Sequence, residues 1–191
     1  MLNIKIIVGS TREGRFSEKL VPWIQNAVTE AGMNPEVLDL RDHPLPFYKE
    51  AGSAAYVQNG EYPDPLVRAW AEKIKEGDAF IIIAPEYNHG YTAVLKNALD
   101  SIYGEWNNKP VTFVAYGSVG GGRAVEQLRQ VAVELQMAPI RAAVHIPAPW
   151  NMRDDKGDLK EGALDGYAHS LTDALTQLAW WGEALKTARA K

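Results

Sequence analysis

Two arginines and three hydroxyl side chains lie in one short turn near the N-terminus of this 191-residue chain. The turn, residues 9–17, follows an apolar run at residues 4–8 that predicts a buried strand, and a helical pattern begins after it. Backbone N–H groups at a helix start attract anions, and arginine and hydroxyl donors suit phosphate. We therefore predict a phosphate site in this turn. Its candidate ligands are Ser10, Thr11, Arg12, Arg15 and Ser17.

The same turn also fits a plain capping role. Ser17 would then be the N-cap of the helix, with Phe16 and Val21 in contact as a hydrophobic staple. Capping does not need two arginines, so we favour the anion site. If Ser17 is the cap, Pro22 falls inside the helix and removes one hydrogen bond, which predicts a kink or a later helix start.

Two common phosphate motifs fit this turn poorly. The spacing from Gly9 to Gly14 is that of a P-loop, but Arg15 and Phe16 stand where a P-loop carries Lys and Ser or Thr. The dinucleotide fingerprint G-x-G-x-x-G is also missing from this junction. The turn therefore favours a mononucleotide over a nucleoside triphosphate or a dinucleotide.

Composition narrows the class of protein. The chain is 46% hydrophobic, enough for one sizeable core, and we expect residues 1–191 to form a single domain. A net charge of −4 gives no reason to expect nucleic acid as a partner, and no apolar run is long enough for a membrane span. There is no cysteine, which excludes disulfides and thiolate chemistry. With no signal-peptide pattern at the N-terminus, we expect a cytoplasmic protein.

The pattern of apolar residues predicts strands that alternate with helices along the whole chain. Asp64 and Pro65 mark one helix start, as N-cap and first helical residue. Further strands are predicted at residues 35–40, 79–84, 110–116 and 140–146. This alternation predicts an α/β fold: a flavodoxin-like, doubly wound, five-stranded parallel sheet in the order 2-1-3-4-5, with helices on both faces.

Ligands of such sheets bind at the carboxyl ends of the strands, where three unusual loops of this chain would meet. One is the arginine-rich turn. The second carries Pro85, Glu86, Tyr87 and Asn88, which offer an aromatic face and an amide, and the third carries Gly117, Ser118, Gly120 and Gly121. Taken alone, Tyr87 fits interface packing and the glycines fit a tight turn. Together with a phosphate site, the loops favour a mononucleotide with a large planar ring.

The connection at residues 41–63 is long and irregular, which is typical of a functional or interface segment. A site lid and a subunit contact are equally good interpretations. Its Phe and Tyr residues, with Trp106 further along, are more apolar than a free surface needs. We therefore expect a homodimer or homotetramer.

The chain resembles the NADPH-dependent FMN reductase family, whose members include flavodoxin-like quinone, azo-dye and chromate reductases. Three blocks carry the resemblance. They are Gly9-Ser10-Thr11-Arg12 through Ser17, Pro85-Glu86-Tyr87-Asn88 followed by Leu95-Lys96-Asn97-Ala98-Leu99-Asp100, and Tyr116-Gly117-Ser118 with the glycines after it. The second block is the most specific. Arg15-Phe16 departs from the small residues often found at that point of the first block.

The resemblance implies an enzyme with bound FMN, which takes hydride from NADPH or NADH and reduces a small acceptor such as a quinone, azo compound, free flavin or metal oxyanion. It implies phosphate contacts from Ser10, Arg12, Phe16 and Ser17, and ring contacts from the second and third loops. No catalytic side chain and no metal are implied. The alternative is a non-enzymatic flavin-binding electron carrier or redox sensor. A hydrolase fits worse, because the G-x-S-x-G elbow is absent.

Overall fold

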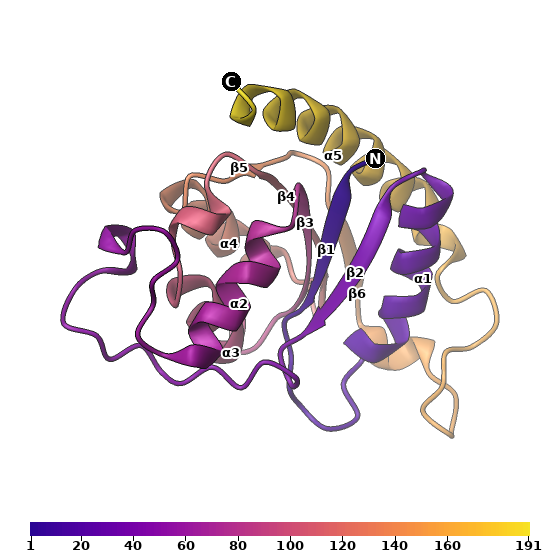
Figure 1. Ribbon diagram of the computed structural model, residues 1–191. Coiled ribbons are helices and arrows are strands. Elements are labelled where there is room, and N and C mark those ends of the chain that lie inside the picture. The colour runs from indigo at the N-terminus through magenta and orange to yellow at the C-terminus, as the bar shows by residue number, and fades with distance from the viewer.

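The computed structural model describes residues 1–191 (Figure 1). Strands and helices alternate along the chain, and three of the longer connections contain only short 3₁₀ turns. The elements are β1 (Asn3–Val8), α1 (Ser17–Glu30), β2 (Asn34–Asp39), α2 (Pro65–Lys75), β3 (Ala79–Pro85), α3 (Ala93–Asp100), β4 (Pro110–Gly117), α4 (Gly122–Glu134), β5 (Ala138–Pro139), β6 (Val144–Pro147) and α5 (Ala168–Arg189). No helix is both long and apolar enough to span a membrane.

The strands form one parallel sheet in the order β2-β1-β3-β4-β5, which confirms the predicted topology. The order reverses at β1, which pairs with β2 on one side and with β3 on the other. Because all strands run the same way, their carboxyl ends lie at one edge, which is the lower edge in Figure 1. The three predicted loops therefore leave the sheet at the same edge.

The fifth position of the sheet differs from the prediction of one strand over residues 140–146. Two short strands, β5 and β6, both pair with β4, and residues 140–143 leave the ladder between them. Side chains satisfy the carbonyl groups there. The Arg129 guanidinium donates to the carbonyls of Ile140 and Arg141, and the Thr112 hydroxyl donates to that of Ala142 at 2.7 Å. These bonds replace the missing backbone pairing.

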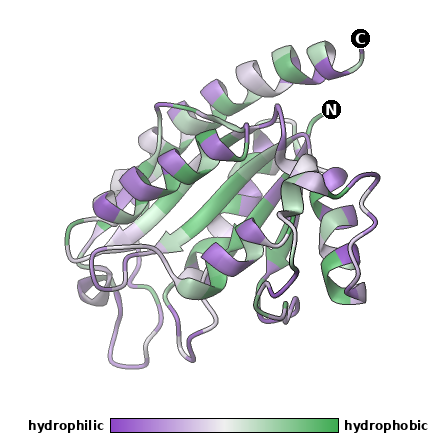
Figure 2. Cartoon of the chain, turned by 90° about the vertical axis from the view of Figure 1, so that its left-hand side faces the viewer, coloured by the Kyte–Doolittle hydropathy of each residue, from purple (hydrophilic) through white to green (hydrophobic).

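Two hydrophobic cores cover the two faces of the sheet. α1 and α5 pack on one face, and α2, α3 and α4 pack on the other. Figure 2 shows the apolar strands between helices whose outer sides are polar. Alternate residues of β1 serve alternate cores, with Ile6 in the first and Ile7 in the second. Both faces are buried, so the central strands read as continuous apolar runs rather than alternating ones.

The two predicted helix starts have different outcomes. Asp64 is the N-cap of α2, where its carboxylate accepts from the N–H groups of Leu66 and Val67, as predicted. The capping role of Ser17 is wrong, because α1 begins at Ser17 itself and Phe16 occupies the cap position without a side-chain bond. The helix continues through Pro22 to Glu30.

The connection at residues 41–63 is irregular except for a 3₁₀ turn at Ala54–Tyr56. Its start is fixed to α3, because the Asn97 amide donates to the carbonyls of Leu45 and Pro46, both at 3.1 Å. The Asn97 position belongs to the second sequence block. That block therefore also holds this connection in place.

The aromatic residues that predicted an oligomer divide into two groups. Trp106 is buried in the core against Phe80 and Trp70, so its use as a surface residue was wrong. Phe47 and Tyr56 do face solvent, with 77% and 81% of their surfaces exposed. Only the second group leaves apolar surface to be covered.

Candidate functional site

A cavity of about 420 Å³ lies at the carboxyl edge of the sheet, a size typical of small-molecule sites. The three predicted loops line it through residues 12–16, 85–87 and 116–117. A fourth wall comes from the segment after β6, through Pro149, Trp150 and Arg153. The topology thus brings together segments that are far apart in the sequence.

The turn before α1 presents unsatisfied donors next to this cavity. The backbone N–H groups of residues 13–18 donate to no backbone carbonyl, and the Ser17 hydroxyl is buried without a hydrogen-bond partner, beside the Tyr116 hydroxyl. The exposed Arg12 guanidinium has no carboxylate partner. Unpaired donors at a helix N-terminus, where the helix dipole is positive, attract an anion.

Arg15, predicted as a phosphate ligand, is already paired within the protein. Its buried guanidinium forms ion pairs with Asp39, at the end of β2, and with Glu18. It also donates to the carbonyl of Ser10. Burial raises the pKa of Asp39, but the hydrogen bonds and charges of Arg15 and Arg41 together outweigh burial and hold that pKa below its usual value. Arg15 lines the cavity, yet its charge is already neutralised, so it holds the turn in shape.

The second loop brings an aromatic side chain to the cavity. Tyr87 and Gly90 exchange backbone hydrogen bonds in a tight turn, which places Asn88 at φ 48° and His89 at φ 76°. The Tyr87 hydroxyl lies 3.2 Å from the Ser10 hydroxyl, so the first two loops are in direct contact. Tyr87 lines the cavity, whereas Asn88 is exposed at the tip of the turn and does not.

Glu86 is bound within the protein. Its buried carboxylate accepts from the backbone N–H of Arg123 at 3.1 Å and pairs with the Arg123 guanidinium. Burial raises the pKa of Glu86, but these hydrogen bonds outweigh burial and lower the pKa below its ordinary value. The N-terminus of α4 therefore already holds an anion.

The glycines of the third loop are explained by packing. Gly121 has φ 72°, and a Cβ there would lie 2.6 Å from the Ala115 Cβ and 2.7 Å from the Tyr116 nitrogen. Gly120 has φ 74° and faces His145. Gly117 is the glycine of this loop that lines the cavity. The glycines let the chain pass close to the sheet before α4 begins.

Some predicted site residues do not line the cavity. Thr11 lines a separate hollow beside α3, and Ser118 is exposed next to Arg123. Ser10 and Ser17 are buried behind the cavity wall. The full set outside the wall is Ser10, Thr11, Ser17, Asn88, Ser118, Gly120 and Gly121.

Six residues that line the cavity were not among the predicted ligands: Glu13, Gly14, Tyr116, Pro149, Trp150 and Arg153. Tyr116 stands next to the predicted glycine loop and packs edge-to-face on Phe16, with ring centroids 5.2 Å apart. Pro149, Trp150 and Arg153 lie in a polar stretch without a motif. The one sequence signal there is a Trp followed three residues later by an Arg in a long loop.

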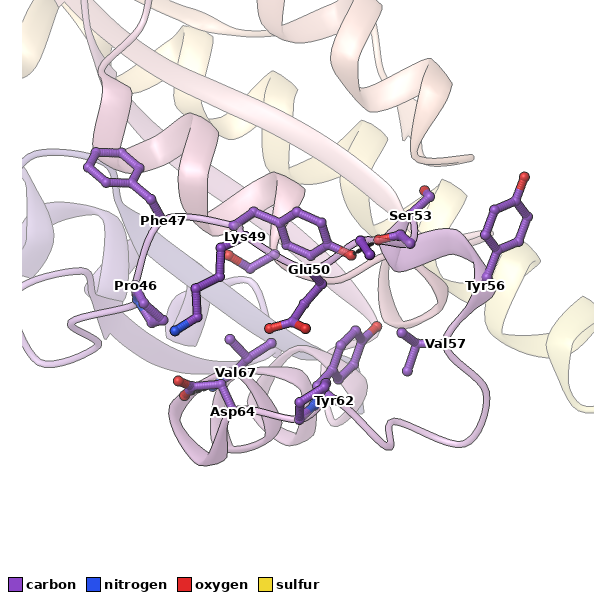
Figure 3. A pocket seen from close by; sticks show the side chains of 15 residues that line it. Pro46, Phe47, Lys49, Glu50, Ser53, Tyr56, Val57, Tyr62, Asp64 and Val67 are labelled. Atoms are coloured by element: carbon purple, nitrogen blue, oxygen red, sulfur yellow. Dashed lines mark hydrogen bonds between the residues drawn. The ribbon is translucent and has the colours of Figure 1, made fainter.

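A second cavity, of about 340 Å³, lies under the connection at residues 46–57 (Figure 3). Its floor includes Tyr62, whose buried hydroxyl donates to Glu105 at 2.7 Å. Phe47 and Tyr56 belong to its wall, and most of each side chain is exposed to solvent. It shares no residue with the carboxyl-edge cavity and has no arginine in its wall.

Comparisons with known proteins identify the family. The profile of the NADPH-dependent FMN reductase family matches residues 2–151. An NAD(P)H-dependent FMN reductase of Schizosaccharomyces pombe is 37% identical over 147 residues, covering 75% of this chain and 73% of that protein. An NAD(P)H:quinone oxidoreductase of Solanum tuberosum is 35% identical over 143 residues, covering 72% and 70%.

The fold is shared with solved flavoenzymes. The flavoenzyme FerB, an NAD(P)H:(acceptor) oxidoreductase from Paracoccus denitrificans, superposes with a TM-score of 0.74 at 22% identity, covering 96% of this chain and 98% of that one. The three sequence blocks, the sheet order and the family match therefore agree. The chain belongs to the NADPH-dependent FMN reductase family.

Proposed function

We propose that the protein is an FMN-dependent NAD(P)H oxidoreductase that reduces a small acceptor such as a quinone. The family match and its FMN reductase and quinone oxidoreductase relatives support the reaction class. The observation that carries the proposal is the N-terminus of α1, which presents unpaired N–H groups and an orphaned Ser17 hydroxyl beside the cavity. A phosphate-bearing cofactor would satisfy these donors.

The residues of the cavity wall support FMN as the ligand. Arg12 and the N–H groups of residues 13–18 would hold the 5′-phosphate. Tyr87 and the backbone of Pro85 and Gly117 would lie against the ring. Thr11, Asn88, Ser118 and Gly120 remain proposed contacts, reached only by backbone or by movement of their loops.

When bound, FMN supplies the redox chemistry by accepting hydride from the nicotinamide and passing electrons on to the acceptor. The residues of this chain bind and orient. Burial raises the pKa of the Tyr116 hydroxyl above its ordinary value, so the phenol stays protonated at neutral pH. No side chain in the cavity is required as a nucleophile or general acid.

The assembly and location follow as further proposals. The exposed Phe47 and Tyr56 support a homodimer or homotetramer, with the connection at residues 41–63 at the subunit boundary. We also infer one domain over residues 1–191 and a cytoplasmic location.

Steady-state kinetics test the proposed function. Purified protein loaded with FMN should oxidise NADPH or NADH when a benzoquinone is supplied. Donor and acceptor would use the same ring face in turn, so double-reciprocal plots should give parallel lines. Intersecting lines would indicate a ternary complex and contradict the shared face. Bound FMN without turnover of either nicotinamide would identify an electron carrier or sensor instead.

A further inference from the structure

The segment at residues 148–160, here called the post-β6 segment, forms the fourth wall of the cavity. It leaves β6 at the carboxyl edge and lies, in orange in Figure 1, beside the start of α1. Two contacts attach it to the turn before α1 and to that helix. Lys19 pairs with Asp158 at 2.5 Å, and the Arg153 guanidinium donates to the carbonyl of Gly14 at 3.1 Å.

Arg153 is also oriented by an aromatic ring. Its guanidinium carbon lies 5.4 Å from the centroid of the Phe16 ring, a cation–π distance. Phe16 is itself buried and packed on Tyr116. The ring and the Gly14 carbonyl thus hold the guanidinium at the cavity wall without using all of its donors.

Two arginines beside the turn before α1 have no carboxylate partner. Arg15 and Arg41 pair with Glu18, and Arg15 also pairs with Asp39. Neither Arg12 nor Arg153 makes an ion pair, and both line the cavity. Two uncompensated guanidinium groups match the charge of a phosphate dianion.

The nearby carboxylates do not neutralise Arg153. Asp154 accepts from the N–H groups of Lys156 and Asp158 within its own turn. Asp158 is held by Lys19. Glu13 is the one acidic side chain that lines the cavity without a cation partner, and it is exposed.

We propose that Arg153 is a second phosphate-binding residue, facing the FMN phosphate from the post-β6 segment while Arg12 faces it from the turn. The inference rests on the proposed function and deepens it. Arg153 lies outside the stretch matched by the family profile, which ends at residue 151. The structure therefore assigns part of the cofactor site to a region that the sequence motifs do not cover.

Flavin fluorescence quenching on titration tests this assignment. Arg153→Met keeps an unbranched apolar side chain against Phe16 and removes the charge and its donors. It should weaken FMN binding about ten- to hundredfold, the range for losing one charge-assisted phosphate contact. Riboflavin lacks the phosphate, so its affinity should change by less than about twofold. Arg153→Lys keeps the charge but loses the planar guanidinium with its paired donors. Its FMN affinity should therefore lie between those of Arg153→Met and the wild type.

The matched control is Lys156→Met, which removes one cation from the same segment but outside the cavity wall. It should leave both flavin affinities unchanged. An equal loss of FMN and riboflavin in Arg153→Met would overturn the proposal and make Arg153 a structural residue of the segment. Unchanged FMN affinity would overturn it as well. Wild-type protein that binds no FMN would instead overturn the proposed function.

Discussion

The two strand–glycine–helix junctions at the carboxyl edge look alike in sequence but differ in what they hold. The junction before α4 receives an anion from within the protein, because the Glu86 carboxylate accepts from the Arg123 N–H. At the junction before α1 no carboxylate accepts from the backbone, because Glu18 in the first turn pairs with Arg15 and Arg41. The N–H groups of residues 13–18 donate to no backbone carbonyl. A helix N-terminus satisfied by its own protein cannot serve a ligand. The difference supports the proposal that the phosphate of a ligand binds at the N-terminus of α1.

The glycines follow the same division. At the α4 junction Gly121 is needed for positive φ and close packing on β4. At the α1 junction Gly14 also has positive φ, of 61°, but a side chain there would meet open space. The glycine at the α4 junction is therefore required by packing against β4, whereas Gly14 at the α1 junction has open space beside it.

The largest expected effect comes from overfilling the α4 junction. Gly121→Val places a β-branched residue at φ 72° and against the Tyr116 backbone, so it should destabilise the fold by about 3 kcal/mol or more. Urea unfolding measures the loss. Gly122→Ala is the matched control, because a Cβ at Gly122 meets nothing within 4 Å. Similar losses in both variants would contradict the packing explanation.

Substituting the two arginines of the α1 junction should affect different properties: Arg15 the stability of the fold, and Arg12 the affinity for FMN. Arg15→Ala leaves Asp39 without its partner and should cost about 3 kcal/mol of unfolding free energy, the range for breaking a buried ion pair. Arg12→Ala should leave stability within about 0.5 kcal/mol, as is usual for a surface change. It should instead weaken FMN binding about ten- to hundredfold, with riboflavin unchanged. Thermal unfolding and flavin titration on both variants provide the comparison.

A smaller loss of stability is expected when the charge of Glu86 is removed. Glu86→Gln removes the charge that the α4 junction holds and should cost about 1–2 kcal/mol at neutral pH. Because the folded-state pKa of Glu86 is lowered, its contribution is present above the unfolded-state pKa and is lost as the pH falls through the folded-state value. The stability difference between wild type and variant should therefore shrink below about pH 4. A difference that does not change with pH would show that the charge is unimportant.

Much of the fold was predictable from the sequence because its signals are local. The buried run Ala79–Pro85 and the Asp64-Pro65 helix start each specify one element without reference to the rest of the chain. Five such elements in alternation leave few sheet orders to choose from. The broken fifth position was not predictable, since it depends on Arg129 and Thr112 side chains from other elements.

The site was predictable only in part, because some of its contacts join residues that are far apart in the sequence. The sequence places Arg12 and Arg15 in one turn with equal claim to the phosphate. Only the fold shows that β2 ends with Asp39 next to Arg15, where the Asp39 carboxylate forms an ion pair with Arg15 and neutralises its charge. Likewise, nothing in the local sequence shows that Arg153 returns to Phe16, because that contact joins positions 137 residues apart (153 − 16).

The most direct test of this account is a side-by-side titration of the wild-type protein with FMN and with riboflavin. The two ligands share the ring and differ in the phosphate. If the α1 junction with Arg12 and Arg153 holds the phosphate, FMN should bind at least about a hundredfold more tightly, since each charge-assisted contact contributes about tenfold or more. The advantage should diminish as salt screens the charges. Equal affinities for FMN and riboflavin would contradict the assignment of the phosphate to α1.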